Sequence, residues 1–101
     1  MSNGFPTGEF TVTASDVVLF PVEGITTITE KGGEYELTTP AEIAIPMTLE
    51  ASGCLVGTHS GRALVVCQIG VDPVTIGGLV TIPTGLMTNG GGQWTAEEGG
   101  G

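Results

Sequence analysis

The sequence predicts an all-β domain, a small antiparallel β-sandwich or barrel of about 7–8 short strands. Thr, Val and Ile dominate where a helical protein would have Ala, Leu, Glu and Lys. The 18 glycines and 6 prolines fall between or at the ends of these β-branched runs, as turn residues do in a sheet of short strands. Sandwiches and barrels need the same alternation and the same turns, so the pattern leaves these two architectures open.

Eight segments have the composition of strands, and their order along the chain predicts a meander. They are residues 9–13, 17–22, 25–30, 34–38, 42–51, 54–58, 63–71 and 74–82. In the fourth of these, Tyr35 and Leu37 would point inward, and Gly32 and Gly33 would supply the hairpin turn before it.

The clearest alternation of apolar and polar residues lies in segment 42–51. Its inward face would hold Ile43, Ile45, Met47, Leu49 and Ala51. Pro46 belongs to the outward set and cannot donate to a ladder, which predicts a sheet edge or a bulge there. In segment 74–82, Gly77 and Gly78 predict a bulge or a close approach of two backbones.

Length and composition predict one β domain over residues 1–85, followed by a flexible Gly-rich C-terminal arm over residues 86–101. The 40% of hydrophobic and 13% of charged residues make the chain too apolar for an intrinsically disordered protein. The large apolar side chains of the arm are Leu86, Met87 and Trp94. A tryptophan in a polar tail needs a packing partner, either its own domain or a neighbouring subunit. We expect Leu86, Met87 and Trp94 to be subunit contacts.

The two cysteines flank a predicted hairpin. If Ser60 and Gly61 are the turn residues, counting outward along both strands places Cys54 opposite Cys67 on a non-hydrogen-bonded rung, where a disulfide is sterically allowed. An oxidised bridge and two reduced thiols both remain open, because the sequence shows no secretory signal but a product that leaves the cell would oxidise.

This cysteine register predicts a change of face. Val56 and Val65 must share the face of the two cysteines, whereas the preceding strand uses odd-numbered residues for its inward side. An inward cysteine face therefore requires a bulge at residues 52–53, where Gly53 tolerates the backbone conformation.

Charge and hydropathy exclude two classes of partner. Eleven acidic and two basic residues give a formal net charge of −9, which repels the phosphates of a nucleic acid. Gly, Pro, Thr or Glu interrupts every apolar run before it reaches the length of a membrane-spanning helix. We expect neither nucleic-acid binding nor a membrane span.

The residues that could carry chemistry do not form a recognisable set. His59 is the only imidazole, and its neighbour Ser60 would point away from it at a hairpin tip, so we expect no catalytic triad. A zinc site of His59 and the two cysteines is opposed by their placement on the hairpin. Paired carboxylates for glycosidase chemistry are better explained as outward strand residues; these are Glu34, Glu36, Glu42 and Glu50.

Calcium would need several oxygen ligands close together in the sequence. Asp16 and Asp72 lack the Asp-x-Asp-x-Asp pattern that supplies them. We expect no catalytic residue, no cofactor and no metal.

These features together favour a non-enzymatic structural or assembly protein. The most suitable class is a virion component, such as a phage capsid-decoration or tail protein, that contacts copies of itself or a larger assembly through protein surfaces. It would be found in the virion, or in the cytoplasm before assembly. The alternative is an exported, disulfide-stabilised β-sandwich that binds a partner at a cell envelope.

Overall fold

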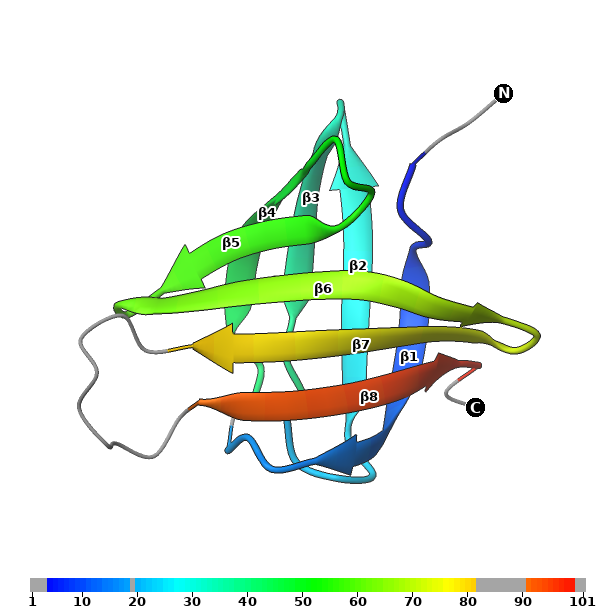
Figure 1. The fold of residues 1–101 in the computed structure, drawn as a ribbon, viewed down its shortest axis with the longest axis vertical. Helices are drawn as coiled ribbons and strands as arrows, with labels where there is room; N and C mark the ends of the chain where they lie inside the picture. Colours follow the sequence, from blue (N-terminus) through cyan, green and yellow to red (C-terminus); the bar gives the residue numbers. More distant parts are fainter. Residues whose placement is uncertain (1–3, 19, 82–90, 100–101) are drawn as a thin grey trace.

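The computed structural model describes residues 4–18, 20–81 and 91–99, which form a closed antiparallel barrel (Figure 1). The eight strands are β1 (Gly8–Ser15), β2 (Ile25–Lys31), β3 (Glu34–Thr38), β4 (Ala44–Leu49), β5 (Leu55–His59), β6 (Arg62–Val71), β7 (Val74–Thr81) and β8 (Gly92–Glu98). Each strand pairs with the next, as the predicted meander requires, and β8 pairs with β1. The fold is therefore the barrel of the two predicted alternatives.

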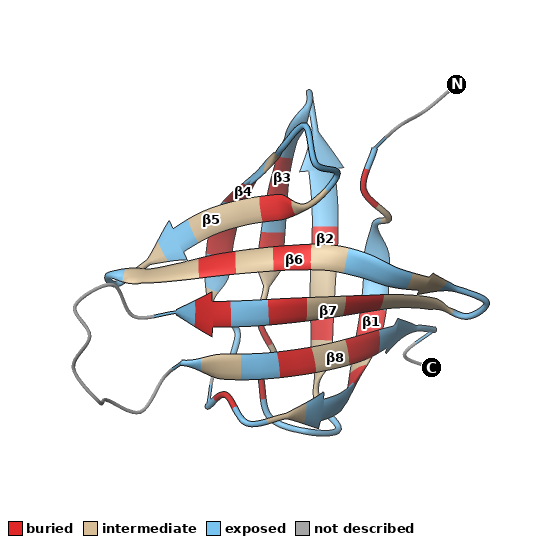
Figure 2. Cartoon of the chain, in the orientation of Figure 1, coloured by how far each residue is buried: buried red, intermediate tan, exposed pale blue. Residues whose placement is uncertain are grey.

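The barrel is flattened into two walls. In Figure 1, β5–β8 form a front wall whose strands run across those of β1–β4 behind it. Alternate residues of each strand point between the walls, so buried and exposed positions follow one another along the ribbons (Figure 2). The buried apolar residues form one core: Phe5, Phe10, Val12, Val17, Phe20, Ile28, Tyr35, Leu37, Ile45, Met47, Leu55, Leu64, Val66, Ile76, Val80, Trp94 and Ala96. Side chains fill the interior, as expected for an eight-stranded barrel.

Several local predictions are confirmed. Tyr35 and Leu37 are buried on β3, and the Gly32-Gly33 turn before them has positive φ angles of 63° and 90°. Ile45 and Met47 are buried on β4, with Ile43 and Leu49 partly buried against the core. Ala51 is exposed, because β4 has already ended at Leu49.

The β4–β5 junction has a short ladder. The two strands pair from Met47 to Leu49, and Pro46 lies immediately before the first of these rungs. On its other side Pro46 pairs with Glu36 in a β3–β4 ladder without a register shift, so the predicted bulge is not found. Pro46 has no N–H to offer, and on the β5 side it lies just outside the ladder. Across the junction, a Cβ added at Gly57 would overlap the Met47 sulfur and the Pro46 carbonyl oxygen, so the absence of a side chain at Gly57 lets β4 and β5 approach.

The strand expected over residues 17–22 is wrong. In its place, the chain makes successive turns, in which Phe20 N–H donates to the Val17 carbonyl and Gly24 N–H to the Pro21 carbonyl. Two apolar residues of this segment, Val17 and Phe20, are buried and cover one end of the barrel core, and we call them the plug. Val18 and Val22 are exposed. At the other end of β1, Phe5 is also buried, and its N–H donates to the Tyr35 hydroxyl at 2.9 Å.

The flexible arm expected over residues 86–101 is also wrong for residues 92–98, which form β8 and close the barrel between β7 and β1. The stretch Gln93-Trp-Thr-Ala-Glu97 alternates polar and apolar residues, and Trp94 and Ala96 face the core. Its neighbouring glycines obscured this signal. Leu86 and Met87 lie outside the described residues, as does Ile82 at the end of the last predicted strand.

Candidate functional site

The candidate catalytic residues lie apart on the surface. His59 ends β5 beside the Ser60-Gly61 turn and faces Arg62 across the hairpin. Glu34 and Glu36 are exposed on β3, as are Glu42 and Glu50 in the turns at either end of β4. In the ranges that the structure describes, no three His, Cys, Asp or Glu side chains gather where a metal ion could be held.

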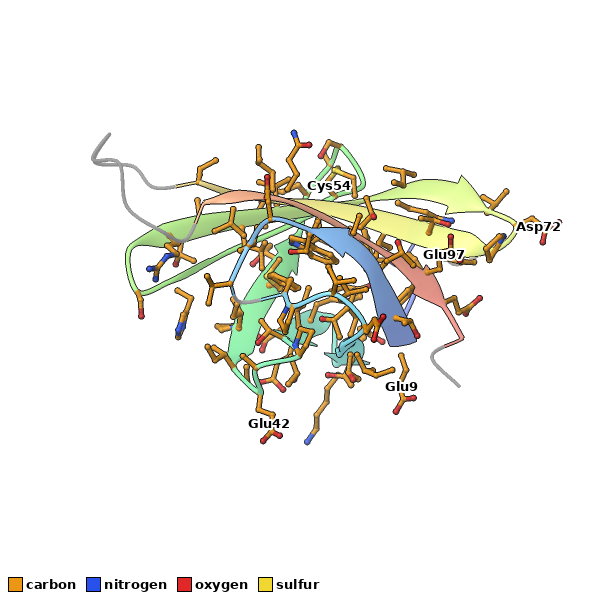
Figure 3. The ribbon with its side chains drawn as sticks, turned by 90° about the horizontal axis from the view of Figure 1, so that it is seen from below. Glu9, Glu42, Cys54, Asp72 and Glu97 are labelled. Carbon is orange, nitrogen blue, oxygen red and sulfur yellow. A yellow bond between two sulfur atoms is a disulfide. The ribbon has the colours of Figure 1, made fainter. Side chains whose placement is uncertain are left out.

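The two aspartates considered as calcium ligands lie at different places on the barrel. Asp16 follows β1, and its carboxylate accepts the Gln93 N–H at 2.7 Å, which ties the end of β1 to β8. Asp72 lies at the tip of the β6–β7 hairpin, distant from Glu9 and Glu42 in Figure 3. Asp16 therefore has a structural role, as the acceptor for a backbone N–H.

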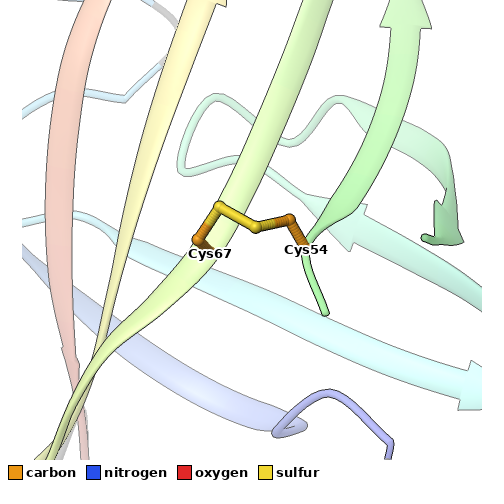
Figure 4. The surroundings of a disulfide bond; sticks show 2 residues. All are labelled: Cys54 and Cys67. Carbon is orange, nitrogen blue, oxygen red and sulfur yellow. A yellow bond between two sulfur atoms is a disulfide. The ribbon is translucent and has the colours of Figure 1, made fainter. Parts of the chain in front are cut away.

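Cys54 and Cys67 form a disulfide, with their Cα atoms 4.4 Å apart (Figure 4). The predicted hairpin register is confirmed: His59 pairs with Arg62 and Val56 with Val65. Ser60 and Gly61 have φ angles of 51° and 77°, the two left-handed residues of a tight hairpin turn. The bridge joins the residue just before β5 to the middle of β6.

The predicted change of face after Ala51 is wrong. Leu55 is buried on β5 and Leu64 and Val66 on β6, so odd-numbered residues stay inward from β4 into β5. The residues between β4 and β5 form a turn in which Gly53 N–H donates to the Glu50 carbonyl. The disulfide consequently lies on the outside of the front wall, where Figure 3 shows Cys54, and not in the core.

Trp94 belongs to the core of its own barrel. It is 1% exposed and stacks on Phe20, with ring centroids 4.0 Å apart. Its indole occupies the space over Gly78, the residue opposite it on β7, where an added Cβ would overlap the ring. The indole N–H is buried and makes no hydrogen bond within the described part of the chain. Trp94 is thus not free to contact another subunit, contrary to expectation.

The outer surface of the front wall is uncharged over most of its extent. We call it the neutral face. Its outward residues are Val56, Thr58, Ala63, Val65, Cys67, Gly77, Leu79, Thr81, Gln93 and Thr95, which alternate with the core residues of β5–β8, and Ile69 at the bulge in β6. Strands β4–β7 contain a single charged residue, Arg62, which has the inward parity of Leu64 and Val66. Glu97, near the end of β8, is the first carboxylate in the outward row of that strand.

The neutral face also carries exposed aliphatic side chains. Leu79 is 41% exposed at its centre, and Ile69 is 60% exposed. Ile69 is the extra residue of a bulge in β6, and its side chain lies against the position where a Cβ on Gly77 would be. Val65, Ile69 and Leu79 line one hollow together, so these aliphatic side chains form a continuous patch, of the kind that marks an interaction site.

Two shallow grooves mark this face and share Val65 as a common lining residue. One runs along the β4–β6 side between Pro46, Val56 and Val65. The other lies over the two glycines of β7 and is bordered by Val65, Ile69 and Leu79. The face therefore has a ridge at Val65 with a hollow on each side.

The carboxylates concentrate on the other wall and in the turns. Strands β1–β3 carry Glu9, Glu30, Glu34 and Glu36, with Lys31 as their one basic residue. In Figure 3, Glu9 and Glu42 lie on the side of the barrel opposite Cys54. The molecule thus has an acidic side and an uncharged, partly apolar side. The residue patterns could have indicated this, because Arg62 and Asp72 are the only charged residues between Glu50 and Glu97.

The structure contains no helix, within the ranges it describes, that has the length and apolar character needed to cross a membrane. Comparison with known proteins gives no match to a family model, to a curated protein or to a solved structure.

Proposed function

We propose that the protein is a non-enzymatic structural protein that assembles through protein–protein contacts, as a virion component of the capsid-decoration or tail type. The observation that supports this most directly is the neutral face, a sheet surface with exposed Leu79 and Ile69 and without carboxylates in a chain of net charge −9. Uncharged aliphatic surface of this kind is typical of the centre of an interface, where charged residues are depleted.

The form of the barrel also suits a building unit. Closure through β1 and β8 pairs the first and last described strands with each other, so neither presents a free edge that would polymerise without control. Association must then use side-chain surfaces. Burial of the neutral face removes water from the fewest charged groups, so contact through this face costs the least desolvation. The disulfide outside the front wall agrees with a protein that works after release into an oxidising medium.

The test is to band particles from the producing culture on a density gradient and to probe each fraction for the protein. Presence in the particle band after a salt wash is the expected result. Protein that remains with the free, unassembled fraction at the top of the gradient would contradict the proposal.

The alternative is an exported β-domain that binds a partner at a cell envelope, and the Cys54–Cys67 disulfide is the observation that favours it. The same fractionation separates the two functions. An envelope protein would be found in the envelope fraction or free in the medium, and would not band with particles.

A further inference from the structure

We infer that the neutral face binds a second copy of this chain, front wall against front wall, in a two-fold symmetric dimer. The inference rests on the proposed function and adds to it the identity of one partner and the surface used. Two features of the described residues lead to it, the distribution of charge and the shape of the face. The area of the face sets how tight the contact can be.

Charge limits how two copies can meet. Each copy carries a formal net charge of −9, so contact through strands β1–β3 would bring Glu9, Glu34 and Glu36 toward like charges. Contact through the neutral face keeps Glu9 on the far side of each barrel, as its position relative to Cys54 in Figure 3 indicates. Glu34 and Glu36 belong to β3, in the wall behind the neutral face. A basic partner would instead be attracted to the acidic wall, and the neutral face offers it no carboxylate until Glu97.

The shape of the face suits pairing with itself. A two-fold interface uses the same patch twice, so every ridge must meet a groove of the same patch. The neutral face has both, a ridge at Val65 and a groove on each side of it. Leu79 pairs with Val65 across the β6–β7 ladder, and the two form an aliphatic pair beside the second groove.

The area predicts a weak dimer. With strand spacings of roughly 4.8 Å and a rise of roughly 3.3 Å per residue, the front wall offers about 500 Å² of sheet surface. This is less than the ~800 Å² that each partner contributes to a stable, standard-size interface. The dimer should therefore form only at high protein concentration. An assembly that holds neighbouring copies close together provides such a concentration locally.

The test uses sedimentation velocity and light scattering from about 10 µM to about 1 mM, the range of a weak interface. The informative variant is Leu79→Glu, which puts a like charge at the centre of the face in both copies. Its matched control is Thr29→Glu, which adds the same charge at an exposed position of β2 on the acidic wall. Circular dichroism verifies that each variant is folded, and Ile69→Glu replaces Leu79→Glu if that variant does not fold.

A concentration-dependent dimer is expected for the wild type and Thr29→Glu, with the dimer Kd of Leu79→Glu raised at least about tenfold. Added salt should tighten the wild-type dimer by screening repulsion between the acidic walls. A wild type that stays monomeric to about 1 mM, or a dimer that Leu79→Glu and Thr29→Glu weaken equally, overturns the inference. If the wild type is monomeric to that concentration but still bands with particles, the dimer is refuted and the proposed function stands. If the wild type dimerises but is absent from particles, the proposed function is refuted and the dimer stands.

Discussion

Phe20 and Trp94 stack face to face inside the barrel, with an interplanar angle of 9° and ring centroids 4.0 Å apart. Phe20 comes from the turns after β1 and Trp94 from the last strand, so the pair joins the plug at one barrel end to the strand that closes the ladder. Both side chains are fully buried. The Trp94 indole N–H makes no hydrogen bond among the described residues, so packing alone holds the pair in place.

We expect Phe20→Ala to lower the free energy of unfolding by about 3–5 kcal/mol, because the cavity it leaves lies against the Trp94 ring. Val18→Ala, at a 72% exposed position two residues away, should change the unfolding free energy by less than about 0.5 kcal/mol. Urea unfolding followed by circular dichroism and by the fluorescence of the single tryptophan measures both. A loss below about 1 kcal/mol for Phe20→Ala would show that the stack contributes little.

The two glycines of β7 should differ in how much stability the same added methyl group costs. Gly78→Ala places a Cβ against the Trp94 indole and should cost about 1–3 kcal/mol or more. Gly77→Ala places it on the outer surface, where the Ile69 side chain can move aside, and should cost much less. In a Trp94→Phe background the cost of Gly78→Ala should shrink, and an unchanged cost would argue against contact with the indole as its cause.

Removal of the disulfide should destabilise the fold without changing its topology. Replacing Cys54 and Cys67 together by Ala opens a loop of about 14 residues and should lower the unfolding free energy by about 3 kcal/mol in the chain-entropy model. A reductant should lower wild-type stability by a similar amount and leave the double variant unaffected. If the wild type, with both thiols shown by mass spectrometry to be alkylated, unfolds at the same urea concentration as before reduction, this account of its stability fails.

Glu42 has a backbone conformation that favours glycine. Its φ is 66° in the turn before β4, and its side chain is exposed. Glu42→Gly should raise the unfolding free energy by about 0.5–1 kcal/mol by relieving the left-handed conformation. Glu42→Ala removes the same carboxylate but keeps a Cβ, so it should show no such gain in thermal or urea unfolding. Equal gains for both variants would assign the effect to charge instead.

Much of the local structure was predictable because it depends on alternation and turn chemistry. Counting outward from Ser60 and Gly61 was enough to place Cys54 opposite Cys67, since a two-residue turn fixes the register of a hairpin. Inward Tyr35 and Leu37 followed from the period of a strand.

The errors arose where apolar residues do not mark the core. The hairpin around the disulfide is apolar on both faces, so Val56 and Val65 were assigned inward with the cysteines although they belong to the outside. Segment 17–22 has strand composition but serves as a plug around Phe20. No short-range pattern distinguishes these cases, because the partner that buries Phe20 is Trp94, far along the chain.

The pairing of β8 with β1 means that β1 cannot complete its ladders until the last strand of the barrel has been synthesised. Until Trp94 and Ala96 emerge, a nascent chain has unsatisfied edges on β1 and β7, and its core stays open to solvent on one side. A product truncated before residue 92 would keep both edges open and would be a target for chaperones and proteases.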